Sequence, residues 1–171
     1  MPRALELALV LLTAPLWVAL MGLVALALLP GGRPLLFLQR RPGLHGRPFT
    51  ILKFRTMRPG PGTDAERVTR VGRILRATSL DELPELINVL RGEMALVGPR
   101  PLLMEYLAEY TPAEQHRHDV RPGITGWAQI HGRNAIDRAE KIRYDLEYVA
   151  RRSTAFDFRI LFLTLFHLKG N

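Results

Sequence analysis

The stretch of sequence that decides the fold runs from Leu75 to Pro101 and reads LRATSLDELPELINVLRGEMALVGPRP. It contains an adjacent acidic pair, Asp81 and Glu82, followed by Pro84. Proline has a fixed φ and no backbone N–H, so it suits the first turn of a helix and little else in a helix. We therefore expect a helix over 85–90, with the acidic pair in the turn before it, and we interpret this stretch as the floor of an active site.

A structural interpretation of the acidic pair competes with this one. Ser79 is a suitable helix N-cap, Glu82 would close a capping box, and Asp81 would complement the helix dipole. Such a helix would begin at Leu80, however, and Pro84 inside it would remove a hydrogen bond to the Leu80 carbonyl. The position of Pro84 therefore favours a helix that begins there.

With the helix beginning at Pro84, the two carboxylates lie between Arg76 and Arg100 along the chain. Carboxylates next to guanidinium groups suit a doubly negative phosphate bound with magnesium. Arg100 stands between Pro99 and Pro101, and a turn that is stiff on both sides lowers the ordering cost when a guanidinium binds a phosphate. The candidate site thus combines ligands for Mg²⁺ with rigidly presented cations.

The length of 171 residues suits one domain with a modest core. Lys and Arg number 24 against 16 Asp and Glu, a formal charge of +8, which predicts an anionic partner: nucleic acid, an anionic membrane surface or a phosphorylated substrate. The absence of Cys excludes disulfides, thiolate metal sites and cysteine nucleophiles. Apolar spacing predicts a mainly helical α+β fold, with short strands over 49–54 and 94–97 and further helices over 64–78, 102–110, 139–151 and 156–168.

An uncharged run of residues, 7–29, predicts a membrane element near the amino terminus. A helix of this length is about 34 Å long, enough to span a bilayer. Pro15 divides it into arms of about 12 and 21 Å, and neither arm alone crosses the hydrocarbon core. A kinked span and a re-entrant hairpin therefore both remain possible. We expect residues 1–32 to form this membrane element and residues 33–171 to form a cytosolic catalytic domain on the membrane surface.

The charges around this run favour the hairpin. No acid lies between residues 31 and 63, and Arg3 with the terminal amine adds positive charge at the other end. The positive-inside rule then puts both ends in the cytoplasm. A cleaved signal peptide is a rival interpretation, since residues 25–27 fit a cleavage site, but the apolar run exceeds the usual ~7–15 residues. The basic residues between 31 and 63 are Arg33, Arg40, Arg41, Arg47, Lys53, Arg55 and Arg58.

Lys53 and Arg55 differ from the other basic residues because the predicted strand over 49–54 ends there. A strand end holds a side chain more rigidly than a loop does. We therefore expect Lys53 to lie in the active site, whereas most of the other arginines attract anionic lipid at about 1 kcal/mol per charge.

Taken together, these motifs resemble the bacterial sugar transferases, which are monotopic phosphoglycosyl transferases. Their fixed order covers most of the chain after Gly31, which makes the match highly specific. The motifs that carry it are Lys53-Phe54-Arg55-Thr56-Met57, the run 78–86, the run 88–94, Val97-Gly98-Pro99-Arg100-Pro101 and the run 121–129.

The resemblance implies a re-entrant helix that breaks at Pro15, enters one leaflet and leaves both termini in the cytoplasm. The expected location is the cytoplasmic face of a bacterial inner membrane. Family members often have Ser before this proline, whereas this chain has Ala14, which removes a hydroxyl that could satisfy a freed carbonyl. The terminal helix over 156–168 is too short to span a bilayer, and both a buried and an interfacial helix remain possible; its phenylalanines and flanking cations favour the interface.

The resemblance also implies the reaction. A sugar-1-phosphate moves from a UDP-sugar to a polyprenyl phosphate such as undecaprenyl phosphate, UMP leaves, and the pathway goes on to a glycoconjugate. Asp81 is the expected nucleophile, forming a phospho-aspartyl intermediate. Asp81 and Glu82 are the expected ligands of the cofactor Mg²⁺.

Further residues match the family motifs. Arg76 corresponds to a phosphate-binding arginine, and the turn over 99–101 lies at the nucleotide in relatives. Gln129 and Arg133 either contact the sugar or nucleotide or have a structural role in the loop. His131 stands where relatives commonly have Asn, a departure that bears on the donor.

The expected partners are the UDP-sugar donor, the polyprenyl phosphate acceptor and inner-membrane lipids, with a homodimer left open. The alternative function is a non-enzymatic, basic membrane-surface adaptor that binds anionic lipid. An adaptor explains the charge and the apolar ends, but it gives no reason for an acidic pair between arginines. We expect no nucleic-acid partner, because no recognisable module is present.

Overall fold

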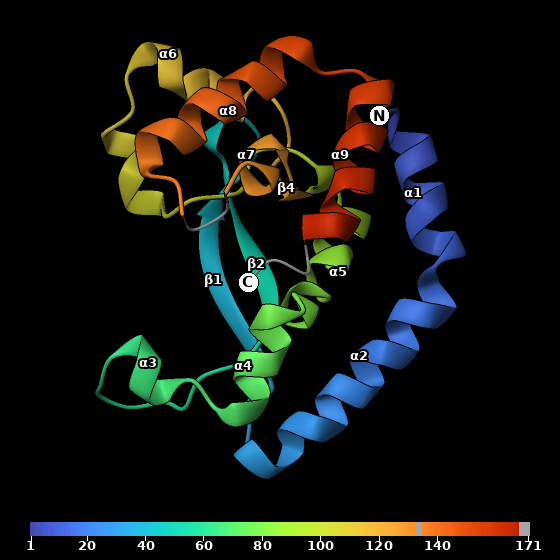
Figure 1. Ribbon diagram of the computed structural model, residues 1–171, viewed down its shortest axis with the longest axis vertical. Helices are drawn as coiled ribbons and strands as arrows, with labels where there is room; N and C mark the ends of the chain where they lie inside the picture. Colours follow the sequence, from blue (N-terminus) through green and yellow to red (C-terminus); the bar gives the residue numbers. More distant parts are fainter. Residues whose placement is uncertain (133–134, 168–171) are drawn as a thin grey trace.

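The computed structural model of the protein describes residues 1–132 and 135–167 (Figure 1). It is mainly helical with short strands, which confirms the predicted α+β class. The helices are α1 (Arg3–Leu12), α2 (Ala14–Leu28), α3 (Asp64–Arg67), α4 (Arg70–Ala77), α5 (Glu85–Leu90), α6 (Pro112–Gln115), α7 (Trp127–Ile130), α8 (Arg138–Arg151) and α9 (Thr154–His167). The strands are β1 (Leu36–Pro42), β2 (Pro48–Phe54), β3 (Ala95–Val97) and β4 (Gly123–Thr125), and short 3₁₀ turns are η1 (Leu29–Gly31), η2 (Leu44–Gly46), η3 (Leu80–Glu82), η4 (Met104–Ala108) and η5 (His116–His118).

A two-stranded antiparallel hairpin, β1 with β2, runs through the middle of the molecule (Figure 1). β2 confirms the strand predicted over 49–54, and its Phe49, Ile51 and Phe54 side chains are buried. β1 was not predicted, because the polar and basic residues 39–41 at its centre look like part of the basic stretch around them. Its backbone pairing with β2 holds it as a strand, although its own sequence has no strand pattern.

Helix α5 confirms the helix predicted over 85–90. Asn88, with no exposed surface, fastens this helix to the hairpin. Its Oδ1 accepts a hydrogen bond from the Leu52 N–H at 3.0 Å, and its Nδ2 donates to the Thr50 carbonyl at 2.8 Å. The helix that follows the acidic turn is therefore held against β2 at a fixed position.

Strands β3 and β4 pair in parallel, and β3 confirms the strand predicted over 94–97. The segments beside them cross in direct backbone contact. A Cβ atom on Gly98 would lie 2.4 Å from the Arg121 carbonyl oxygen, and one on Gly123 would lie 2.0 Å from the Gly98 nitrogen. Glycine is required at both positions, and the crossing fixes where the following Pro-Arg-Pro turn begins.

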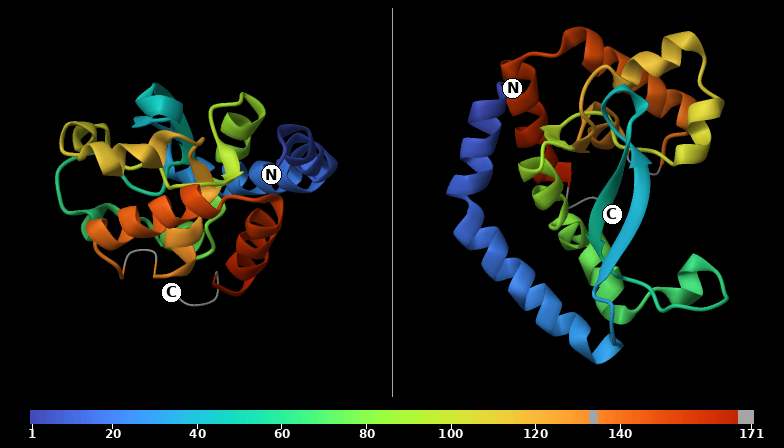
Figure 2. Two further views of the ribbon diagram at one scale, coloured as in Figure 1. Left: turned by 90° about the horizontal axis from the view of Figure 1, so that it is seen from above. Right: turned by 180° about the vertical axis from the view of Figure 1, so that it is seen from behind.

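The two amino-terminal helices run along one side of the molecule and change direction between them (Figure 2). They meet at Thr13, and Pro15 lies in the first turn of α2, so the helix breaks beside the predicted proline. Glu6 of α1 fastens this region to the domain by accepting a hydrogen bond from the Leu96 N–H at 2.6 Å. Val10 is 1% exposed and packs into the core beneath β2 and α5.

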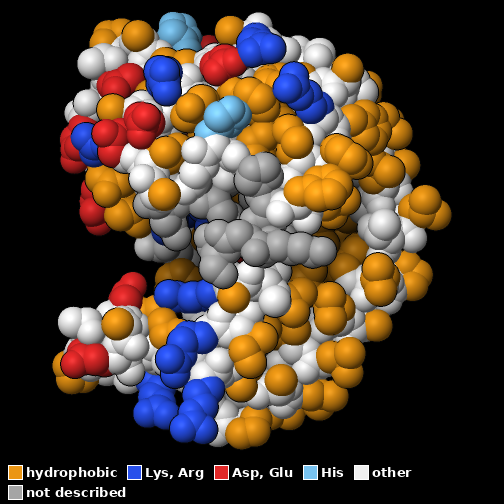
Figure 3. Space-filling model, viewed as in Figure 1, with side chains coloured by type: hydrophobic (Ala, Val, Ile, Leu, Met, Phe, Trp, Pro, Cys, Tyr) orange, Lys and Arg blue, Asp and Glu red, His pale blue; other side chains and the backbone are white. Residues whose placement is uncertain are grey.

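Within the described residues, the segment Ala14–Gly31 is the one helix long and apolar enough to cross a membrane, and 11% of it is buried. Figure 3 shows hydrophobic side chains along the side formed by α1 and α2, whereas Lys and Arg side chains gather near α3 and α4. This distribution is compatible with membrane contact. The re-entrant topology and the division of the chain at residue 32 stay predictions.

The single helix predicted over 64–78 is wrong, because the segment forms two helices separated at Val68 and Thr69. Thr69 caps α4 by accepting a hydrogen bond from the Gly72 N–H at 2.9 Å. Val68 is extended and forms a β-bridge with Met57. An internal threonine in a capping position thus ended one helix and began the next.

The helix predicted over 102–110 is also wrong, because only the short 3₁₀ turn Met104–Ala108 forms there. Prolines bound the segment on both sides. Pro101 precedes it, and Pro112 begins α6 and holds Thr111 extended. Leu103 and Thr111 are both extended, so helical structure is confined to the residues between them.

The helices predicted over 139–151 and 156–168 are confirmed as α8 and α9, although residue 168 lies outside the described part of the chain. α9 has a buried side, with Phe156 and Ile160, and an exposed apolar side, with Phe158 and Phe162. The two alternatives for this helix, a buried helix and an interfacial helix, therefore each describe one of its faces.

We predict that Asn88→Ala lowers the free energy of unfolding by about 3 kcal/mol, because it leaves the buried Leu52 N–H without its partner and removes the hydrogen bonds to the Thr50 carbonyl and to Glu93. Thermal unfolding in detergent measures the change. The control is Gln115→Ala at an exposed position, for which we expect a change within about 0.5 kcal/mol. Equal melting temperatures for the two variants would contradict the assignment of Asn88.

Candidate functional site

A cavity of about 830 Å³ lies beside the hairpin β1–β2 and is lined in part by the protruding arm of residues 55–69 that carries α3. Figure 3 shows the hollow between this arm and the upper part of the molecule. Its walls come from the hairpin, the arm, the turn η3, the Pro-Arg-Pro turn and the ends of α7 and α8. The ionisable residues that line it are Arg41, Lys53, Arg55, Arg58, Arg67, Arg76, Arg100 and Lys141, with Asp64, Asp81, Glu82 and Asp145.

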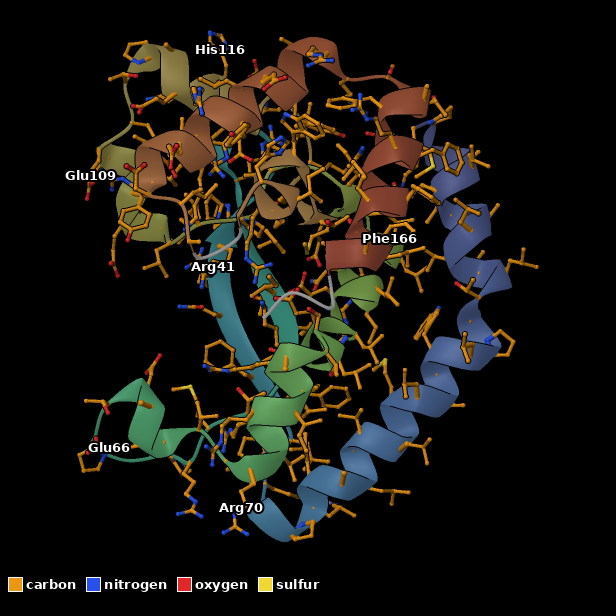
Figure 4. All side chains as sticks on the ribbon, in the orientation of Figure 1. Arg41, Glu66, Arg70, Glu109, His116 and Phe166 are labelled. Atoms are coloured by element: carbon orange, nitrogen blue, oxygen red, sulfur yellow. The ribbon has the colours of Figure 1, made fainter. Side chains whose placement is uncertain are left out.

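The cavity lining thus carries twice as many basic as acidic side chains. Low-dielectric walls lined by one sign of charge concentrate ions of the opposite sign. The cavity therefore suits a multiply charged anion, such as a pyrophosphate. The side chain of Arg41, labelled in Figure 4 near the upper end of β1, is one of the cations that face this region.

The acidic pair lies in the turn η3 that leads into α5. Ser79 before it takes a left-handed conformation, with φ of 56°, and makes no capping hydrogen bond to the turn. The Glu82 N–H donates to the Ser79 carbonyl at 3.2 Å, and α5 begins only after Pro84. The capping-box interpretation is therefore wrong, and the carboxylates are free to face the cavity instead of the helix end.

Two cations hold Glu82. Lys53 Nζ lies 2.7 Å from its Oε1, and Arg100 donates to Oε1 through Nη2 and to Oε2 through Nη1 at 3.4 Å. Burial opposes ionisation of Glu82, but Arg100 and Lys53 outweigh it and bring the pKa of this carboxyl well below its usual range. Glu82 is thus an ionised carboxylate that joins strand β2 to the Pro-Arg-Pro turn.

Asp81 has a different environment. It lines the cavity, and among the described residues no ion pair to it is formed. Burial and the neighbouring Glu82 raise its pKa, while Lys53 and Arg76 act in the opposite direction. Its oxygens remain available for a substrate or a metal ion, and a less stabilised carboxylate is a better nucleophile than one held by two cations.

Sequence reasoning missed Glu85, which lies beneath the site. Its side chain is 1% exposed, and Oε1 is 3.1 Å from Lys53 Nζ. Burial and the charge of Glu82 raise its pKa to about 7. The signal in the sequence was a third acidic residue, directly after Pro84, in a segment that already held Asp81 and Glu82. We interpreted Glu85 only as the first residue of a helix.

The pair Asp81 and Glu82 fits a magnesium site that substrate completes. Mg²⁺ usually takes one or two protein carboxylates and fills its other positions with water and phosphate oxygens. Asp81 offers oxygens without a cationic partner, and Glu82 offers Oε2, whose contact with Arg100 is long at 3.4 Å. Within the described residues no group of three or more His, Asp or Glu side chains forms an all-protein cage, so phosphate oxygens would supply the remaining ligands.

The other predicted site residues divide into three groups. Arg55, Arg76 and Gln129 line the cavity, as expected of substrate-binding residues. Arg76 is oriented by Thr56, whose Oγ1 accepts from its Nε at 2.9 Å. Pro99 and Pro101 flank Arg100 without lining the cavity, Pro15 lies apart from it in α2, and Arg133 lies outside the described residues.

Sequence reasoning also missed a buried ion pair at the edge of the cavity, between Arg117, which does not line it, and Asp145, which does. Both side chains are 2% exposed or less, and Arg117 Nη2 lies 2.6 Å from Asp145 Oδ2. Burial raises the pKa of Asp145 to about 6, and Arg117 acts against this rise. The pairing could not be predicted, because its members are separated by 28 positions and lie among charged residues typical of a surface.

The chain is similar to a family of known proteins. The model of the bacterial sugar transferase family matches residues 1–170. The chain is 53% identical to the uncharacterized sugar transferase EpsL of Bacillus subtilis (strain 168) over 148 residues, covering 83% of this chain and 73% of that protein.

Two further relatives carry more specific names. The UDP-glucose:undecaprenyl-phosphate glucose-1-phosphate transferase of Caulobacter vibrioides is 43% identical, over 95% of this chain and 67% of that protein. The Escherichia coli (strain K12) protein of the same name is 46% identical over 78% of this chain, but the match spans only 32% of the longer protein. The match to the family model over nearly the whole length, together with these identities, establishes that the chain belongs to the bacterial sugar transferase family.

Proposed function

We propose that the protein transfers a sugar-1-phosphate from a UDP-sugar to a polyprenyl phosphate, releases UMP and thereby begins assembly of a glycoconjugate. The names of relatives such as those of E. coli and C. vibrioides support the reaction class. The observation that carries the proposal is the contrast between the two adjacent carboxylates. Glu82 is held by two cations, and Asp81 lies beside it in a cationic cavity without an ion pair.

In the first step, an Asp81 carboxylate oxygen attacks the phosphorus that bears the sugar. A P–O bond to Asp81 forms, the P–O bond to UMP breaks, and UMP leaves with the bonding electron pair. In the second step, an oxygen of the polyprenyl phosphate attacks the same phosphorus. Asp81 then leaves as a carboxylate, so that the enzyme is restored and no external acid or oxidant is needed.

The cations of the cavity stabilise charge during these steps. Arg100 and Arg76 line the same cavity as the acidic pair, where they would contact the pyrophosphate oxygens as negative charge develops on UMP. Lys53 keeps Glu82 in position. Bound Mg²⁺ at Asp81 and Glu82 would add Lewis-acid polarisation of the phosphate oxygens.

The apolar helices give a reason for the location of the site. A polyprenyl phosphate keeps its phosphate at the membrane surface, and α1 and α2 present exposed leucines along one side of the domain. We propose that these helices anchor the protein in the cytoplasmic leaflet of the inner membrane, with Pro15 at the break. This arrangement keeps the cavity at the depth where a soluble donor and a lipid acceptor can both reach Asp81.

The relatives leave more than one hexose as the donor. Several are named for glucose, and one from Streptococcus agalactiae is named a galactosyl transferase. We propose a hexose donor whose ring lies near Gln129, a buried side chain in the cavity wall. An adaptor function is less well supported, since binding of anionic lipid requires no carboxylate at the floor of the cavity.

We predict that Asp81→Asn lowers the rate of UMP release from UDP-glucose in the presence of Mg²⁺ and polyprenyl phosphate by at least about 10³-fold, because an amide is not a nucleophile here. UMP production is measured directly. Asp119→Asn, at an exposed position away from the cavity, is the matched control and should retain the native rate. A similar rate in the two variants would remove Asp81 as the nucleophile.

Glu85 predicts a pH dependence of stability. Because its folded pKa of about 7 lies above its usual value of 4.5, the folded state binds more protons between these values, and its stability falls as the pH rises through this window. Glu85→Gln removes this loss. Relative to the native protein, the variant should therefore gain about 3 kcal/mol of unfolding free energy between pH 4.5 and pH 7.5.

Melting temperatures across this pH range test that prediction. The control is Glu114→Gln, an exposed carboxyl whose pKa is lowered by the Thr111 N–H and hydroxyl and which should show no gain over this window. Parallel melting curves for Glu85→Gln and the native protein from pH 4.5 to 7.5 would show that Glu85 does not titrate as the structure indicates.

A further inference from the structure

The Pro-Arg-Pro turn is held at each of its three carbonyl groups by a different part of the chain. The Gly123 N–H donates to the Pro99 oxygen at 3.0 Å. Arg117 Nη2 donates to the Arg100 oxygen at 2.8 Å, and Arg41 Nη1 donates to the Pro101 oxygen at 3.3 Å. Turns usually leave such carbonyls to water, so this one is unusually constrained.

Arg117 provides the central one of these three contacts, and all three nitrogens of its guanidinium donate hydrogen bonds. Nη2 and Nε bind Asp145 Oδ2 at 2.6 and 3.1 Å, and Nη1 donates to the Tyr110 hydroxyl at 3.2 Å. The side chain is 1% exposed. A guanidinium fork fixed at all three nitrogens holds its carbonyl partner in one position.

The burial of this ion pair needs an explanation other than stability. A buried ion pair loses so much hydration that replacing it with apolar residues is often neutral or stabilising. Arg117 does not line the cavity, so it cannot contact the substrate bound there. It contacts the site in two places, at the Arg100 carbonyl and at Asp145, which lines the cavity.

We propose, building on the function proposed above, that Arg117 is a positioning residue for Arg100, with Asp145 fixing the guanidinium that does so. Arg100 is preceded and followed by proline, so its backbone has few alternatives once its carbonyl is held. Its guanidinium then reaches Glu82 at a set position. Arg117 thereby determines whether the Arg100 side chain meets the acidic pair and the phosphates of the donor.

A double-mutant cycle with steady-state UMP release tests this proposal. Arg117→Lys keeps the charge opposite Asp145 but loses the fork. It should lower kcat/KM about 20-fold in the native background and less than about 3-fold when Arg100 is already alanine, because positioning matters only while Arg100 is present. The loss should also divide between kcat and KM as it does for Arg100→Ala. Arg143→Lys, on the exposed face of α8, is the control and should have the native kcat/KM.

A second variant guards against misfolding. Arg117→Met with Asp145→Leu removes both buried charges and leaves no unpaired ion. It should melt near the native temperature and still lose activity, again only in the background that retains Arg100. Equal losses in the two Arg100 backgrounds, for both variants, would show a general structural role and overturn the proposal.

The rate at which phenylglyoxal modifies Arg100 reports whether its guanidinium is held by Glu82, and it requires no enzymatic turnover. In the native protein Glu82 protects this guanidinium, so mass spectrometry should find it modified several-fold faster in Arg117→Lys, measured against the exposed Arg143 in the same sample. An unchanged ratio would contradict the positioning role. If no UDP-sugar yields UMP with the native protein, the proposed transferase function fails, and the labelling ratio alone still decides the role of Arg117.

Discussion

The contact on which the site depends is the binding of one carboxylate, Glu82, by two cations from distant parts of the chain. Lys53 comes from the end of β2, and Arg100 comes from the turn after β3. Because both reach the same side chain, the hairpin, the acidic turn and the Pro-Arg-Pro turn are fixed relative to one another. Asn88 supports this arrangement from below by fastening α5 to β2. Each element is short, and their common contact gives the cavity its shape.

The same contact gives two neighbouring carboxylates different chemistry. Lys53 and Arg100 neutralise Glu82 and lower its pKa, whereas burial and the charge of Glu82 raise the pKa of Asp81. Glu82 thus organises the cations, and Asp81 keeps its oxygens available. This division of roles explains why an adjacent acidic pair, with a proline two residues later to end the turn, suits the proposed reaction, in which the site binds a pyrophosphate and attacks it.

Patterns within a few residues of the sequence predicted most of the site, whereas contacts between residues far apart in the chain were not predicted. Pro84 correctly located α5, and the strand ending at Lys53 was correctly expected near the acidic pair, because both follow from backbone rules within a few residues. The pair Arg117 and Asp145 could not be predicted, since each lies among charged residues typical of a surface. β1 escaped prediction for the same reason. The helix predicted over 102–110 failed where prolines at both ends outweighed apolar spacing.

The most direct measurement is mass spectrometry of the native protein incubated with a hexose-bearing UDP-sugar and Mg²⁺ in the absence of polyprenyl phosphate. Trypsin should release residues 77–91, which contain Asp81. The proposed mechanism predicts that this peptide gains the mass of one hexose phosphate, that fragmentation places it on Asp81, and that adding acceptor removes it. If the donor supports normal turnover and this peptide never carries that mass, transfer does not pass through Asp81 and the proposed mechanism is wrong.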